Sequence, residues 1–166
     1  MKETGHKSRY FWLAAAVIWM VVIFGFSSQK ADQSSEISGT LVYQIVESVS
    51  RAAHLDWKDE MILSYANMLE HPVRKAAHMT EYAIFACILL GNCMQYPKLQ
   101  KKPYLWAELG AVFYAATDEF HQLFVDGRSC ELKDVAIDSI GALLGLLIAW
   151  IVISIWNRFK TKKRKR

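Results

Sequence analysis

The sequence predicts an all-α membrane protein, a bundle of four transmembrane helices with amphipathic helices on its extracytoplasmic side. Three observations predict this fold class: two long apolar runs, two shorter apolar runs between them, and basic residues concentrated near the chain ends. The hydrophobic share of 53% is one that soluble proteins approach, so the clustering of these residues is more informative than their number.

The first and last apolar runs are the clearest span candidates. Residues 10–26 contain no charge, and residues 135–156 contain one acid. A spanning helix needs ~20 mostly apolar residues, which these runs approach or exceed. The shorter runs, 76–94 and 104–117, contain acids, and the second is long enough only if it continues to Phe124. We therefore expect spans at residues 10–27, 76–95, 104–123 and 135–156.

A cleaved signal peptide is the alternative interpretation of the first run. The basic N-terminus fits a signal peptide, but the apolar run is longer than usual and contains Trp12, Trp19 and Phe24. The following "SSQKADQSS" offers no convincing small-residue cleavage site. We favour an uncleaved span.

The charges predict the topology. Four spans place three segments on one side of the membrane: residues 1–9, 95–103 and 157–166. Together they hold 13 of the 20 Lys and Arg residues and a single acid. Residues 28–75 and 118–134, on the other side, hold seven Lys and Arg and twelve acids. Because basic flanks stay in the cytoplasm, both termini are predicted to be cytoplasmic.

The basic tail, residues 157–166, could also indicate nucleic-acid binding. Directly after a span, however, such a tail is typical of an orientation signal that contacts anionic lipid headgroups. We therefore expect membrane lipids as partners and no nucleic acid.

The outer segment, residues 28–75, is predicted to form two amphipathic helices. The first has apolar residues in steps of four, with Val42 and Val46 beside them: Ile37, Leu41, Ile45 and Val49. The second follows a possible cap at Asp56 and is expected to end at His71-Pro72. Its apolar residues are Met61, Ile62, Tyr65, Met68 and Leu69. These helices either pack on the outer ends of the spans, which we favour, or lie in the headgroup layer.

Ionisable residues recur at the predicted outer ends of three spans. In "RKAAHMTEY", His78 and Glu81 are three residues apart and share a helix face. The third span contributes Asp118, His121 and Gln122, and the fourth contributes Asp134 and Asp138. An acid inside a span needs water or a partner, so these groups are predicted to point into the bundle and converge on one outer pocket.

Four segments in this order resemble the VanZ-like family of bacterial membrane proteins: "FSSQ", "RKAAHMTEY", "YAATDEFHQLFVDGR" and "DVAIDSIGALLG". The resemblance runs from about residue 24 to residue 145, and residues 10–156 are the expected family domain. The matching positions are Ser28, Gln29, Arg74, Lys75, His78, Glu81, Tyr82, Asp118, Glu119, Gln122, Gly127, Arg128, Asp134, Asp138 and Gly141.

The resemblance implies a role in the cell envelope and a place in the bacterial plasma membrane. The family's namesake is an accessory glycopeptide-resistance protein associated with reduced susceptibility to teicoplanin. A lipid-linked cell-wall precursor and a lipoglycopeptide are therefore the implied partners. The family supplies no settled biochemical activity, and the residues carry no acyl-transfer or phosphate-transfer signature.

Three hypotheses for the polar cluster remain open: an active site on a lipid-linked or phosphate-bearing substrate, a binding site without chemistry, and ion pairs that only hold helices in register. For an active site, the expected catalytic residues are His78, Glu81, Asp118, Glu119, His121, Asp134 and Asp138. The expected substrate-binding residues are Ser28, Gln29, Arg74, Lys75, Tyr82, Gln122 and Arg128. His78–Glu81 and Arg128–Asp134 are the candidate structural pairs.

A divalent cation is a variant of the first hypothesis, because His and carboxylates are suitable ligands, although no strict metal motif is present. Cys87 and Cys93 are expected to pack as small apolar side chains. Gly141 and Gly145 form a GxxxG that predicts a close helix contact inside the bundle. The oligomeric state stays open.

The topology is testable on intact cells. An impermeant thiol reagent should label Cys130, which lies in the predicted outer loop, and added protease should leave the C-terminal tail intact until the cells are lysed. A tail that protease removes from intact cells would reverse the predicted orientation.

Overall fold

The computed structural model describes residues 3–164. Residues 1–2 and 165–166, which belong to the predicted basic ends 1–9 and 157–166, lie outside the described part. The described part is all-helical and contains no strand, which confirms the predicted all-α class. Its elements are α1 (Glu3–Ser27), α2 (Ala31–Ala52), α3 (Asp59–Cys93), the 3₁₀-helix η1 (Leu99–Lys101), α4 (Pro103–Gln122) and α5 (Leu132–Arg164).

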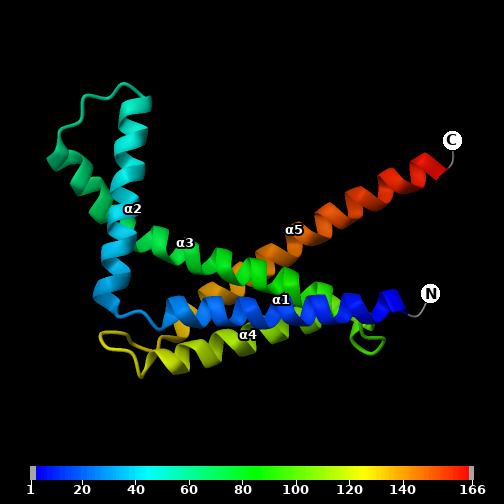
Figure 1. Cartoon of the computed structure of the whole chain (residues 1–166). Helices are drawn as coiled ribbons and strands as arrows, with labels where there is room; N and C mark the ends of the chain where they lie inside the picture. Colours follow the sequence, from blue (N-terminus) through cyan, green and yellow to red (C-terminus); the bar gives the residue numbers. More distant parts are fainter. Residues whose placement is uncertain (1–2, 165–166) are drawn as a thin grey trace.

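Four helices form a bundle, and the fifth lies across one end of it. α1, α4, the later part of α3 and the earlier part of α5 run along the bundle, with α3 in contact with all three others (Figure 1). α2 crosses the end where α1 stops and α5 starts, and it packs on the first part of α3. Both ends of the described chain and the α3–α4 loop lie at the opposite end (Figure 1). We call the end with α2 the α2 end and the other the termini end.

The closest contact in the bundle joins α3 and α5. A Cβ atom at Gly141 would lie 2.7 Å from the Cα of Met79, and one at Gly145 would lie 2.7 Å from the Cα of Ala83. Real Cβ atoms do not approach other atoms so closely, so the two backbones meet only because both residues are glycine. This confirms the predicted close helix contact.

Small residues and polar contacts fix the other helices. α4 presents three fully buried alanines, spaced by four, to the bundle: Ala107, Ala111 and Ala115. α1 is held through two ring donors, since Trp19 donates to the Glu81 carbonyl at 2.9 Å and Tyr114 donates to the Met20 carbonyl at 2.7 Å. At the termini end, Arg9 donates to the Gln95 carbonyl at 3.1 Å.

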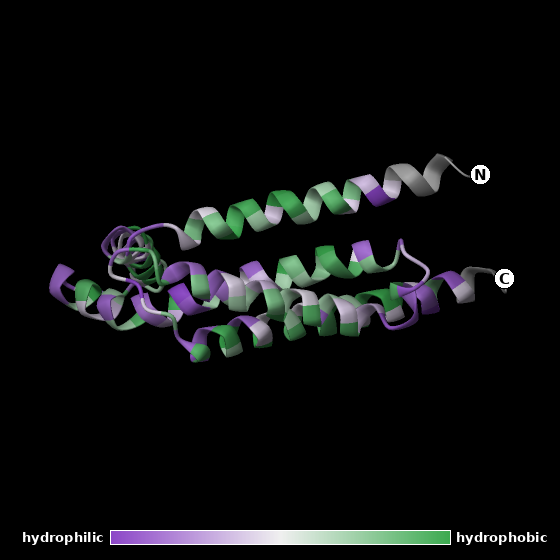
Figure 2. Cartoon of the chain, turned by 90° about the horizontal axis from the view of Figure 1, so that it is seen from below, coloured by the Kyte–Doolittle hydropathy of each residue, from purple (hydrophilic) through white to green (hydrophobic). Residues whose placement is uncertain are grey.

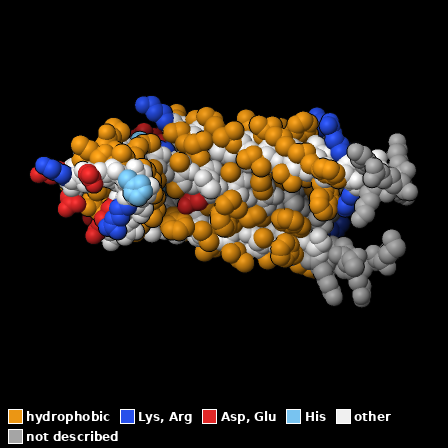
Figure 3. All heavy atoms as spheres, turned by 90° about the horizontal axis from the view of Figure 1, so that it is seen from above, with side chains coloured by type: hydrophobic (Ala, Val, Ile, Leu, Met, Phe, Trp, Pro, Cys, Tyr) orange, Lys and Arg blue, Asp and Glu red, His pale blue; other side chains and the backbone are white. Residues whose placement is uncertain are grey.

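Two helical segments of the described chain are long and apolar enough to cross a membrane: Ser8–Ser27 in α1 and Leu132–Thr161 in α5. Their apolar side chains are largely exposed; Phe11 and Val21, for example, are both 65% exposed. The apolar surface covers the middle of the bundle, and hydrophilic residues collect at its ends (Figures 2 and 3). Such a belt is unfavourable in water and is what lipid solvates.

The predicted spans at 76–95 and 104–123 fall in α3 and α4, which do not reach the same combination of length and apolarity. The physical reason is the polar groups that they carry, among them Glu81 in α3 and Glu108 in α4.

Two details of the outer segment were predicted wrongly. α3 does not end at His71-Pro72 but continues through Pro72 to Cys93, and Lys58 rather than Asp56 precedes its first residue, without a side-chain cap. A proline lacks the N–H that would donate to the carbonyl four residues earlier, here that of Met68, and Met68 is exposed, so water can reach this carbonyl.

The predicted amphipathic helix at 37–49 is confirmed as part of α2, and its apolar residues divide between two faces. Val42 and Val46 are buried against Ile62 and Ala66 of α3. The residues spaced by four are between 48% and 59% exposed: Ile37, Leu41, Ile45 and Val49. Packing therefore accounts for one face of the helix and leaves a second apolar face uncovered in this chain.

The glycine contact predicts a specific loss of stability. Gly145→Val should lower the stability of the detergent-solubilised protein by about 1–3 kcal/mol, because the new side chain overlaps the α3 backbone. Gly25→Ala is the matched control, since a Cβ at Gly25 meets nothing within 4 Å. Equal melting temperatures for the two variants would contradict the close α3–α5 approach.

Candidate functional site

A layer of buried polar side chains lies where α1, α4 and α5 reach the α2 end. Ser27, Asp118, Glu119, Gln122 and Asp138 are each at most 5% exposed. The spacing of 118, 119 and 122 places all three α4 residues on the helix face turned towards the bundle.

A chain of hydrogen bonds satisfies most of this layer. The Ser27 hydroxyl donates to Asp118 Oδ2 at 2.7 Å, and Gln122 Nε2 lies 3.0 Å from both Ser27 Oγ and Glu119 Oε1. The backbone N–H of Glu131 donates to Glu119 Oε2 at 3.0 Å. The end of α1, the end of α4 and the α4–α5 loop are thereby joined through buried acids.

A pocket of about 160 Å³ opens beside this layer. Its walls come from the start of α2, the middle of α3, the end of α4, the α4–α5 loop and the start of α5. The predicted site residues that line it are Arg74, Lys75, His78, Glu119, Gln122, Arg128, Asp134 and Asp138. Three helices and one loop thus bring much of the predicted cluster together.

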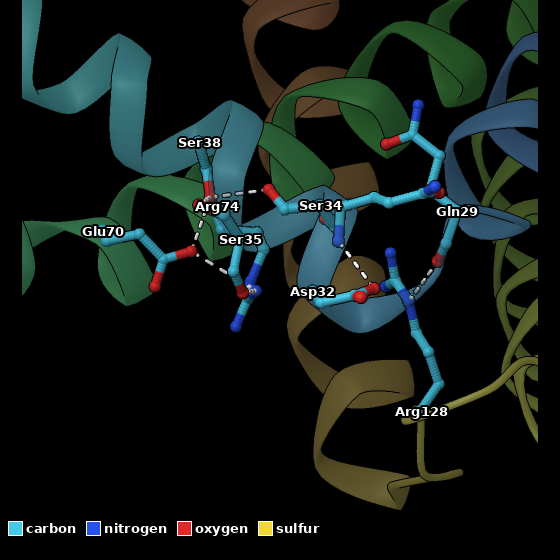
Figure 4. A network of polar contacts seen from close by, with 9 residues as sticks. Gln29, Asp32, Ser34, Ser35, Ser38, Glu70, Arg74 and Arg128 are labelled. Carbon is cyan, nitrogen blue, oxygen red and sulfur yellow. Dashed lines mark hydrogen bonds and ion pairs between the residues drawn. The ribbon is translucent and has the colours of Figure 1, made fainter.

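Two of the pocket's cations have acidic partners within the chain. Lys75 forms a hydrogen-bonded ion pair with Asp134 at the start of α5. Arg74 lies 3.3 Å from Glu70 and donates to Ser35 of α2 at 2.7 Å, while Ser38 donates to Glu70 (Figure 4). These contacts fasten α2 to α3 and hold the Arg74 guanidinium at the edge of the pocket.

Arg128 is placed by the α4–α5 loop and has no carboxylate within ion-pair distance among the described residues. Its Nε donates to the Gln29 carbonyl at 3.0 Å, which leaves its two terminal nitrogens available (Figure 4). The loop passes close to α2 at Gly127, which has a φ of 76° and whose added Cβ would lie 3.2 Å from that of Ala31. Burial, followed by the neighbouring Arg74 guanidinium, lowers the pKa of Arg128 from its ordinary value.

An exposed ion pair also holds this loop. Lys30 Nζ lies 2.8 Å from Asp126 Oδ2, and the hydrogen bond with Lys30 lowers the pKa of Asp126. Since both groups are in water, the pair aligns the loop more than it stabilises the fold.

His78 lines the pocket with Glu81 behind it. Nδ1 of His78 lies 3.7 Å from Glu81 Oε2, which is within ion-pair range but longer than a hydrogen bond. No described residue hydrogen-bonds to its Nε2, so this nitrogen could donate to or accept from a ligand.

Other predicted site residues lie outside the pocket. The Ser28 hydroxyl and His121 Nε2 lie 3.2 Å apart, and the His121 ring stacks on Phe24. Gln29 contributes through its backbone carbonyl. Tyr82 and Asp118 are buried in the bundle, where the Tyr82 hydroxyl and Asp118 Oδ1 have no hydrogen-bond partner among the described residues.

The suggested Arg128–Asp134 ion pair was wrong. Asp134 pairs with Lys75 instead, because α3 and α5 lie in direct contact whereas the α4–α5 loop turns Arg128 towards α1. Glu108, in the middle of α4, has a buried oxygen without a hydrogen-bond partner among the described residues.

Sequence reasoning missed several residues of the site. His71 lines the pocket because α3 continues through Pro72, which places it one turn before Arg74 and Lys75 and two turns before His78. Had the helix been extended, the seven-residue spacing of the two histidines would have identified it. Ser27 and Glu131 act through tertiary contacts that no local pattern signals.

The described residues contain no group of three or more His, Cys, Asp or Glu side chains arranged to hold a metal ion. The hypothesis of a bound divalent cation is therefore not supported by any group of ligands among the described residues.

Comparison with models of protein families matches residues 12–153 to the family described as VanZ/LLP1, which covers most of the chain. Comparison with curated proteins and with solved structures gave no match.

The Lys75–Asp134 pair allows a double-mutant test. Lys75→Met should lower the melting temperature in detergent, because it leaves a partly buried carboxylate unpaired at a cost of about 1–3 kcal/mol. Adding Asp134→Leu should restore much of the loss, whereas Lys133→Met, at an exposed lysine, should change little. Additive losses in the double variant would contradict the pairing.

Proposed function

The chain belongs to the VanZ/LLP1 family, and from that membership we propose that it is a four-span protein of the bacterial plasma membrane that binds a phosphate-bearing lipid headgroup in its outer pocket. In this proposal both termini face the cytoplasm and the α2 end faces outward.

The lengths and ends of the helices support four spans. α4 has 20 residues, about 30 Å of helix, which equals the apolar segment of α1. Arg9 holds one end of α1 to the α3–α4 loop, and Arg128 of the α4–α5 loop bonds to Gln29, two residues after the other end of α1. A membrane that contains α1 would therefore contain α4 and the adjoining part of α3.

The charge distribution supports the orientation. Figure 3 shows Lys and Arg among the described side chains at the termini end, and acids mixed with bases at the α2 end. Because basic flanks remain in the cytoplasm, the termini end would be inside and the pocket outside.

The exposed apolar face of α2 supports a place in the outer headgroup layer. α2 runs across the bundle axis, and would thus lie in the plane of the membrane (Figures 1 and 2). The first part of α3 also exposes apolar residues: Met61, Tyr65 and Met68. An amphipathic pair in this position would seat the pocket at headgroup depth.

The ligand proposal rests on the surroundings of Arg128. Its guanidinium lies in a half-buried pocket with Arg74 and His71, without a carboxylate of its own. A guanidinium without an ion-pair partner in a partly desolvated site favours an anionic group, and its fork binds phosphate through two N–H donors.

The volume of the pocket limits what enters it. A cavity of about 150 Å³ accommodates a molecule the size of benzene, and this pocket of about 160 Å³ is similar. It would take the phosphate end of a lipid-linked cell-wall precursor but not its sugars and peptide. Reduced susceptibility to lipoglycopeptides such as teicoplanin, which the family resemblance implies, remains a prediction that rests on the family alone.

A second candidate function is catalysis on the same substrate, and the arrangement of His78 favours it. His78 lines the pocket and its Nδ1 lies 3.7 Å from Glu81 Oε2, so a small side-chain movement would give a general acid or base oriented by a carboxylate. Asp138 on the facing helix supplies a second carboxylate at the same pocket.

Lipid binding to the detergent-solubilised protein tests the proposal. Native mass spectrometry with dioleoyl phospholipids should show bound lipid, and Arg128→Gln should weaken binding about tenfold or more because a charge-assisted contact is lost. Arg51→Gln, at an exposed arginine at the end of α2, is the matched control and should bind as the wild type does.

The same experiment separates the two functions. A change in the mass of the lipid extracted after incubation, present with the wild type and absent with His78→Gln, would favour the enzyme. Equal lipid binding by wild type and Arg128→Gln would overturn the phosphate site.

A further inference from the structure

We propose that the ligand of this pocket is an amino-phosphate headgroup, one that carries a phosphate and a primary ammonium, and that Arg128 binds the phosphate while Asp138 accepts the ammonium. The inference rests on the proposed phosphate site and names its ligand class.

The charge balance of the pocket argues against a purely anionic ligand. The pocket is lined by three basic residues, Arg74, Lys75 and Arg128, and by four acidic residues. The acids are Glu119, Glu131, Asp134 and Asp138. A headgroup with only negative charge would meet at least as many acids as bases, and in a partly desolvated site that repulsion is large.

The contacts within the chain show which acid is left for a ligand. Asp134 is paired with Lys75, and both oxygens of Glu119 accept hydrogen bonds from the chain. Glu131 is exposed to solvent and accepts from Ser129. Asp138 differs from all three: it is 3% exposed, lines the pocket, and accepts no hydrogen bond from any described residue.

A buried carboxylate without a donor is costly, so its oxygens need a donor from the pocket side. Arg128 does not supply it, because the two side chains line the same pocket without lying within ion-pair distance of each other. A guanidinium and a carboxyl group on separate walls, neither with an ion-pair partner in the chain, suit a ligand that carries both a phosphate and an ammonium.

A two-carbon amino-phosphate group satisfies these conditions. It carries its phosphate and ammonium at opposite ends, it is small enough for the pocket, and its N–H donors suit a carboxylate that lacks them. The same chemistry occurs on a phosphatidylethanolamine lipid and in soluble phosphoethanolamine.

Native mass spectrometry with three lipids of identical dioleoyl chains tests the proposal. Wild-type protein should retain phosphatidylethanolamine about tenfold more tightly than phosphatidylglycerol, which has no cation. Phosphatidylcholine, whose quaternary ammonium has no N–H to donate, should bind no better than phosphatidylglycerol. Soluble phosphoethanolamine should compete, and its affinity relative to the lipid distinguishes a free compound from a headgroup as the source.

Asp138→Asn should reduce phosphatidylethanolamine binding to the level of phosphatidylglycerol. Asp59→Asn, at an exposed residue at the start of α3, is the matched control and should keep the wild-type preference. Equal retention of phosphatidylglycerol or phosphatidylcholine by the wild-type protein would overturn the ammonium site and leave the phosphate site standing. Failure of all three lipids to bind would overturn both.

Discussion

The contact between the backbones of α3 and α5 is the constraint on which the rest of the structure depends. The helices run in the same direction, and the four-residue step from Met79 to Ala83 matches the step from Gly141 to Gly145. Side chains at these positions would separate the helices. With the helices in contact, Lys75 meets Asp134, and His78 and Asp138 line the same pocket. The site therefore depends on two residues that contribute no functional group to it.

The apolar surroundings impose the second constraint, that buried polar groups find partners within the chain. Ser27 donates to one oxygen of Asp118, Gln122 donates to one oxygen of Glu119, and a loop N–H donates to the other oxygen of Glu119. In satisfying the acids, these bonds also connect α1, α4 and the α4–α5 loop. The polar layer is thus part of what holds the α2 end together, which explains why so many ionisable residues need not all take part in function.

Structural ion pairing accounts for part of the cluster and leaves a defined remainder. Lys75–Asp134 holds α5 against α3, and Arg74–Glu70 is a pair within α3 whose members hydrogen-bond to Ser35 and Ser38 of α2. Arg128, His78 and Asp138 differ, because each lines the pocket and has polar atoms to which no described residue hydrogen-bonds. A purely structural role would leave these groups desolvated without compensation. In the proposed function, these three residues are the part of the cluster that contacts the ligand.

The sequence by itself determined the features that depend on local composition: the all-α class, the apolar segments of α1 and α5, the amphipathic α2 and the family. It also indicated the convergence of residues such as His78 and Asp138, because helical spacing predicts which side chains share a face. Tertiary structure alone decided the pairing. Asp134 meets Lys75 and not Arg128, His121 stacks on Phe24 outside the pocket, and His71 joins the pocket because α3 continues through Pro72. The physical reason is that an ion pair or a hydrogen bond depends on distances of a few ångströms between segments far apart in the chain, and these distances follow from how helices pack and loops turn, which no local pattern records.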